Sequence, residues 1–174
     1  MTKKLTPIFS LTLFLIVTSC TLESEFSLPN NEAIDSELLG LWSPTNNPKE
    51  SVKIERRTDK RYKLTLIDGD DQEELIAYST TIRERKILTI ITEDEVGLSY
   101  QFYGISMTNN SLTYSEVNNQ IREEKFESQQ DLYDFFLTHI EKDYFFKNPE
   151  TLKKYPINLK CITRDQQFKL KVIK

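Results

Sequence analysis

Between Leu38 and Phe126 the sequence alternates between apolar and polar residues with a period of two. Val52 and Ile54 stand among charged neighbours, and the same spacing recurs in every apolar stretch up to Phe126. Successive side chains of a strand point to opposite faces, so this spacing collects the apolar residues on one face. The pattern is typical of an antiparallel sheet with one face against a core and the other in water.

Eight such runs can be counted, and short polar turns separate them. Asp68-Gly69 and Asn109-Asn110 are two of these turns, and both residue pairs tolerate the positive φ that tight hairpins need. Short connections predict a meander, and eight strands are enough to close an up-and-down barrel. The predicted strands span residues 39–45, 51–57, 61–67, 74–82, 86–92, 96–107, 111–117 and 120–126.

After Glu127 the period changes from that of a strand to that of a helix. Ser128 is a suitable cap, and the apolar residues from Leu132 to Ile140 fall on one helical face. Asn148-Pro149 predicts a second, short helix that ends at Pro156. The tail, 157–172, alternates again and predicts a terminal strand. The fold class is therefore mainly β: an antiparallel barrel of about eight strands, one or two C-terminal helices and a short terminal strand.

The first twenty residues have the features of an export signal. Lys3 and Lys4 precede an apolar run over residues 8–17, and small residues lead to Cys20. The run is shorter than the roughly 20 apolar residues of a membrane span. Val17-Thr18-Ser19-Cys20 resembles the bacterial lipobox, and this resemblance implies that residues 1–19 are removed and that Cys20 receives acyl chains. Thr21 is not the aspartate of inner-membrane retention, so the resemblance implies the outer membrane if the cell is Gram-negative.

These features divide the chain into a signal peptide (1–19), a lipidated cysteine with a flexible tether (20–37) and one folded domain (38–174). The formal net charge is −4 and becomes −6 without Lys3 and Lys4, which disfavours nucleic acid as a partner. Two cysteines occur in the chain, and acylation of Cys20 would leave Cys161 with no partner for an intramolecular disulfide.

Gly40-Leu41-Trp42 resembles the Gly-x-Trp opening of lipocalin-like barrels. In that family the tryptophan closes one end of the barrel, and a basic residue from late in the chain packs on it. The resemblance implies this role for Trp42, with Arg122 and Arg164 as candidates for the basic residue. The stretch from Ser128 to Tyr155 is also similar to the tails of small bacterial lipocalin-like lipoproteins.

The aromatic residues of the later strands admit two interpretations. Tyr100, Phe102 and Tyr114 line an apolar pocket if the even-numbered face around Val96–Phe102 points into the barrel. Alternatively, they simply fill the core, since small eight-stranded barrels do either. The run 144–146 is a candidate surface patch for a partner.

Three other clusters could carry chemistry, but each has a simpler interpretation. The acidic stretch 68–74 offers oxygen ligands but lacks the spacing of a calcium loop, and so predicts a solvated turn. His139 is the only histidine, and it could pair with Cys161, bind a metal, or simply pack in the helix. The basic run 56–63 could contact an acidic partner or lipid phosphate, but acidic residues interrupt it.

The sequence therefore predicts a cell-envelope protein held to the membrane by a lipid on Cys20. We expect a non-enzymatic protein without a cofactor or bound metal that takes up a small apolar ligand or lipid in its barrel. The alternative is an envelope interaction or scaffold protein with a filled barrel, in which Gly40 and Trp42 have a structural role. A hydrolase-type enzyme is the third possibility.

Overall fold

Eight antiparallel strands close into a barrel in the computed structural model, which describes residues 21–45, 47, 49–93, 97–108 and 110–155. The barrel strands are β2 (Gly40–Pro44), β3 (Glu50–Thr58), β4 (Arg61–Asp68), β5 (Asp71–Ile82), β6 (Arg85–Glu93), β7 (Leu98–Thr108), β8 (Ser111–Val117) and β9 (Phe146–Tyr155). The other elements are β1 (Glu23–Ser24), the 3-10 helices η2 (Ser36–Leu38) and η3 (Asn119–Ile121), and the helix α1 (Gln129–His139).

Each strand from β2 to β8 pairs with its neighbour in sequence, and β9 completes the ring between β8 and β2. Leu152 of β9 lies opposite Leu112 on one side and Pro44 on the other. Closure removes the free edges that an open sheet would expose. The predicted antiparallel barrel is confirmed, and it is consistent with the lipocalin resemblance.

The predictions for the segment between β8 and the end of β9 need two corrections. Residues 120–126 form no strand: η3 and a loop lie there instead. The second helix is also wrong, because β9 covers Asn148-Pro149 and supplies the eighth strand. Asn148 has φ +50°, and the pairing of β8 with β9 shifts register beside it. Asn-Pro therefore marks a bulge, where a missing N–H is tolerated, rather than a helix start.

The N-terminal segment, residues 21–38, lies on the barrel. Its short strand β1 pairs with β7 through Glu23↔Gln101 and Ser24↔Tyr100. Leu22 and Leu28 are buried. The prediction of a flexible tether is therefore wrong for this segment, because its leucines fill spaces on the barrel wall. The predicted terminal strand, 157–172, lies outside the described residues.

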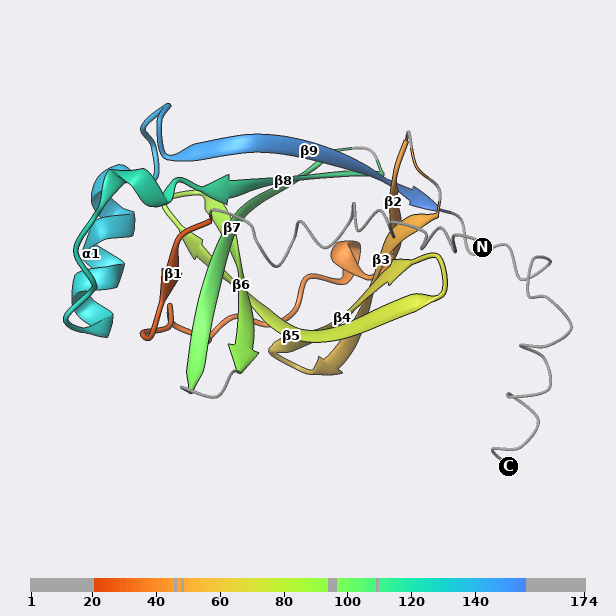
Figure 1. Cartoon of the computed structure of the whole chain (residues 1–174), viewed down its shortest axis with the longest axis horizontal. Coiled ribbons are helices and arrows are strands. Elements are labelled where there is room, and N and C mark those ends of the chain that lie inside the picture. Colours follow the sequence, from red (N-terminus) through yellow and green to blue (C-terminus); the bar gives the residue numbers. More distant parts are fainter. Residues whose placement is uncertain (1–20, 46, 48, 94–96, 109, 156–174) are drawn as a thin grey trace, which may run out of the picture.

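The apolar residues form two clusters, on opposite faces of the sheet. The outer cluster combines the outward side chains of β5–β8 with the N-terminal segment and α1, which covers one side of the barrel (Figure 1). Phe136 is fully buried there, 5.3 Å from Phe102 between ring centroids. Gly104 belongs to the same wall, and a Cβ on it would overlap the ring of Phe146. The apolar residues of α1, spaced three or four positions apart, therefore lie on one helical face and cover this wall.

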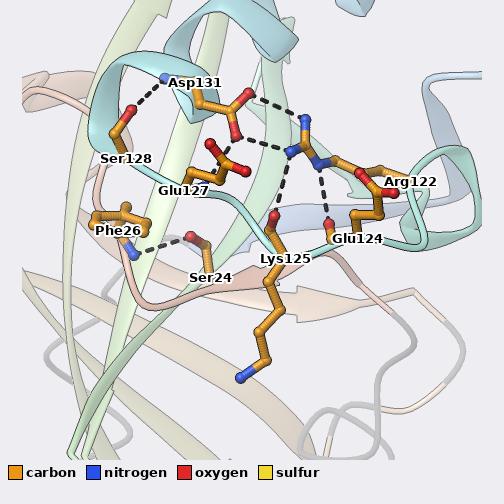
Figure 2. Close-up of polar contacts among 8 residues, drawn as sticks. All are labelled: Ser24, Phe26, Arg122, Glu124, Lys125, Glu127, Ser128 and Asp131. Atoms are coloured by element: carbon orange, nitrogen blue, oxygen red, sulfur yellow. Dashed lines mark hydrogen bonds and ion pairs between the residues drawn. The ribbon is translucent and has the colours of Figure 1, made fainter.

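An ion pair ties the loop after β8 to the start of α1 (Figure 2). The guanidinium of Arg122 donates to both carboxylate oxygens of Asp131, at 3.1 and 2.8 Å, and to the backbone carbonyls of Glu124 and Lys125. Asp131 also accepts from the backbone N–H of Glu127. The pair is bidentate, which holds the loop in one geometry.

Candidate functional site

The barrel interior is the first place to look for a ligand site, and large side chains occupy it. The inner cluster takes at least one buried side chain from every barrel strand, which is possible only where all eight strands face one another. Trp42 and Tyr62 are fully buried in it, and Tyr103 is 4% exposed. The strand residues of this cluster are Trp42, Ile54, Tyr62, Leu64, Ala77, Ile90, Tyr103, Ile105, Leu112 and Leu152.

The predicted pocket residues divide between the two faces. Phe102 is buried in the outer cluster, and Tyr100 packs against the same cluster. The condition for a pocket on this strand, an even-numbered face that points into the barrel, is therefore not met for Tyr100 and Phe102. Tyr103, on the opposite face, belongs to the inner cluster.

Tyr114 is the one predicted pocket residue that packs on the inner cluster, with its ring 6.3 Å from that of Tyr103. Burial raises the pKa of Tyr114, and the nearby carboxylate of Glu150 raises it further. The hydroxyl of Tyr114 donates to that carboxylate at 2.6 Å. This phenol therefore stays protonated and acts as a hydrogen-bond donor.

Trp42 is fully buried near the start of β2, at one end of the barrel. Its indole N–H donates to the carbonyl of Leu38 at 2.8 Å, which ties η2 across the opening. Gly40 has φ +145°, and a Cβ there would lie 2.7 Å from Cε of Lys154. The ammonium of Lys154 lies 5.0 Å from the centre of the Trp42 ring and donates to the carbonyl of Glu37. These contacts are consistent with the structural role that the Gly-x-Trp resemblance implies for Gly40 and Trp42.

The basic residue over the tryptophan is Lys154, which sequence reasoning missed because β9 was assigned to a helix. Arg122 pairs with Asp131 and lies over Phe126 instead, with its guanidinium 4.5 Å from that ring. Arg164 lies outside the described residues. A strand assignment for residues 146–155 would have placed Lys154 on the same face as Leu152, which belongs to the inner cluster.

Two hollows lie around this closed end. One, of about 340 Å³, is lined by Glu37, Met107, Thr108, Asn110 and Lys154. The other, of about 220 Å³, is lined by Asp35, Leu38, Glu84, Lys86, Ile105, Ser106 and Met107. Lys86 forms an ion pair with Asp35, and its hydrogen bond lowers the pKa of that carboxyl. The ion pair of Lys86 and Asp35 in the second hollow therefore holds the N-terminal segment against the barrel.

A third region surrounds Thr21, the residue that follows Cys20. Thr21 is 5% exposed and bridges to Asn118, whose backbone N–H donates to the carbonyl of Phe145. The Asn118 amide donates to the carbonyl of Tyr144 at 3.1 Å, and Lys147 donates to Asn119. We call Thr21, Asn118, Asn119, Tyr144 and Lys147 the Thr21 surface. Cys20 itself lies outside the described residues.

The remaining candidates have local partners. His139 shares a hydrogen bond of 3.0 Å with the hydroxyl of Tyr144, and its ring lies 4.9 Å from that of Phe135, while Cys161 lies outside the described residues. The acidic stretch 68–74 is the β4–β5 turn and the start of β5. The basic run is the β3–β4 hairpin, in which Arg56 pairs with Asp59. In the part of the chain that the structure describes, no three acidic, histidine or cysteine residues are grouped to hold a metal.

Comparisons with protein-family models, curated proteins and solved structures gave no significant match. Among the described residues, no helix has both the length and the apolar character required to cross a bilayer.

Proposed function

We propose that this chain is a lipid-anchored cell-envelope protein with a lipocalin-like barrel, and that it works through its exterior as a non-enzymatic interaction or scaffold protein. The observation that carries the proposal is the inner cluster, in which buried side chains from all eight strands meet. A barrel of this size has room either for its own side chains or for one small ligand. A barrel filled by its own side chains is favoured by the large buried rings of Trp42, Tyr62 and Tyr103.

The anchor part of the proposal rests on residues 1–20, with their basic head, apolar run and lipobox-like ending at Cys20. Two or more acyl chains give stable membrane attachment. In a bacterial host, Cys20→Ser should move the protein out of the membrane fraction and abolish labelling by a radioactive fatty acid. Cys161→Ser is the matched control and should leave both unchanged. Membrane partitioning that survives Cys20→Ser would contradict the anchor.

The exterior part of the proposal is tested by titrating the purified protein with a fluorescent fatty acid. We expect no saturable binding, because a ligand inside the barrel would have to displace the inner cluster. Binding at one equivalent that Tyr62→Leu weakens and Leu41→Ala leaves unchanged would instead favour the barrel interior as a ligand site.

That alternative, a binding protein for a small apolar molecule, has one observation in its favour. Val52, Leu75 and Leu88 pack against the inner cluster yet keep partial exposure. A ligand in contact with these three side chains would cover apolar surface that water now reaches, and each buried methylene would contribute about 0.8 kcal/mol. The fatty-acid titration separates the two proposals directly.

A further inference from the structure

The connection between the acylated residue and the folded barrel is one peptide bond long. Thr21 is buried, and its hydroxyl donates to the carbonyl of Phe102 at 2.7 Å. The next residue, Leu22, donates its backbone N–H to the carbonyl of Val117 at 2.9 Å. Consecutive Cα atoms are 3.8 Å apart across a trans peptide. A single peptide bond therefore joins residue 20 of the sequence to a residue that is fixed in the barrel wall.

We propose that the Thr21 surface lies against the lipid bilayer and that the barrel is held there in one orientation. This inference rests on the proposed acylation of Cys20. Acyl chains that begin next to a fixed residue bring the headgroup layer to the surface around that residue. A flexible tether would have let any face of the barrel meet the membrane, and the packing of residues 21–38 removes that freedom.

The residues around Thr21 suit the headgroup layer of a membrane. Thr21, Asn118 and Phe145 stand on three adjacent chain segments, which places the backbone beside Tyr144 about 10 Å from Thr21 at the usual strand spacing. Tyr144 is 51% exposed, as much as any large apolar side chain in the described part of the chain. An exposed tyrosine with a hydrogen-bonded hydroxyl combines an apolar ring with a polar tip, the combination enriched at membrane interfaces.

Charge around Tyr144 is mixed, which identifies zwitterionic lipid as a sufficient partner. Lys142 and Lys147 are close in sequence to Tyr144, and so are Glu141 and Asp143. Opposite charges in equal number give little attraction to anionic headgroups. The orientation should therefore appear on vesicles of phosphatidylcholine alone and should change little when an anionic lipid is added.

The experiment uses the full chain, processed in a bacterial host and reconstituted into phosphatidylcholine vesicles that contain a lipid with a nitroxide headgroup. In a Cys161→Ser background, one fluorophore is placed at Asp143→Cys, beside Tyr144, or at Asp70→Cys. Both changes remove one exposed aspartate, and Asp70 lies in the β4–β5 hairpin, on the opposite side of the barrel from α1 and β1 (Figure 1). We expect the nitroxide to quench the label at 143 severalfold more than the label at 70.

Two further variants test the cause of that difference. Ten glycine and serine residues inserted between Cys20 and Thr21 keep the acyl chains but add a coil of about 17 Å, and should make the quenching at 143 and 70 equal. Tyr144→Ser should reduce quenching at 143, whereas Tyr155→Ser, which changes another exposed tyrosine (44% against 51%) elsewhere, should have no effect.

The outcomes separate this inference from the proposed function. Protein that fails to float with the vesicles contradicts the acyl anchor itself. Protein that floats with equal quenching at 143 and 70 keeps the anchor and overturns the fixed orientation. A difference that survives the inserted linker overturns the inference that the short connection sets the orientation. Only a difference that is lost with the linker supports it.

Discussion

Replacement of Gly40 by alanine should destabilise the barrel by about 3 kcal/mol, from two sources that can be separated. Gly40 has φ +145°, a conformation open essentially to glycine alone, and forcing another residue into it costs about 1–3 kcal/mol. The new Cβ would also lie 2.7 Å from Cε of Lys154 and displace that side chain. Lys154 would then lose its position over Trp42 and its bond to Glu37, together about 1 kcal/mol.

Urea unfolding followed through Trp42, the only tryptophan, measures this loss in the unacylated Cys20→Ser chain. With a slope of about 2 kcal/mol per molar urea, 3 kcal/mol lowers the midpoint by about 1.5 M. Lys154→Ala alone should cost about 1 kcal/mol. Gly40→Ala in that background should cost only about 2 kcal/mol, because the strained backbone remains and the clash does not.

Gly69→Ala is the control for the backbone contribution. Gly69 has φ +59° with no atom within 4 Å of a new Cβ, so only the cost of about 1 kcal/mol for a left-handed alanine is expected. A loss below about 0.5 kcal/mol for Gly40→Ala would refute the reasoning as a whole. If Gly40→Ala still costs about 3 kcal/mol in the Lys154→Ala background, the clash with Lys154 contributes nothing and that part of the reasoning is refuted.

Three other changes test the contacts that hold α1 and the N-terminal segment. Phe136→Ala empties a fully buried position beneath α1 and should cost about 3–5 kcal/mol in urea unfolding; a loss under 1 kcal/mol would contradict the packing. Arg122→Lys removes the bidentate contact to Asp131 and should cost about 1–2 kcal/mol, whereas an unchanged midpoint would show that the loop needs no such tie. Lys86 lowers the pKa of Asp35 below its usual 3.8, so the contribution of this carboxylate is complete above pH 3.8 and disappears as the pH falls through the lowered pKa. Asp35→Asn should therefore destabilise by about 1 kcal/mol at neutral pH and by nothing in strong acid; an equal loss at both pH values would contradict the assignment.

Period-two alternation was sufficient to predict the strands from β2 to β8, because each run alternates over its length and ends at a turn. It failed for β9, whose inward face places the charged residues Glu150 and Lys154 on either side of Leu152 and whose bulge contains Asn148-Pro149. Asn-Pro is typical of a helix start when it is read locally. The need to close the ring overrides that local preference, and closure is a property of the whole sheet that no single window of sequence contains.

The N-terminal segment was misread for a related reason. Residues 21–38 carry no strand or helix period, because they follow the outer wall and then one end of the barrel and bury isolated residues such as Leu22, Leu28 and Leu38. A segment that packs as single side chains on an existing wall leaves no periodic signal. The apolar outward residues of β5–β8 were the available clue, since a wall that carries Ile82, Ile87 and Phe102 needs a cover.

Strand β7 shows why alternation does not by itself separate the inside of a barrel from the outside. Phe102 and Tyr103 are both buried, one beneath α1 and one among the eight strands, so each parity carries an apolar face. The pairing settles the direction: Tyr103 lies opposite Leu88, two residues from Ile90, which itself lies opposite Ala77. These positions share a face with Trp42 and Tyr62 in the inner cluster, while the face of Phe102 continues into the helix. Ala77 is fully buried in the same cluster and lies opposite Tyr62 across β4 and β5, so this small residue belongs to a packed interior and does not mark a cavity.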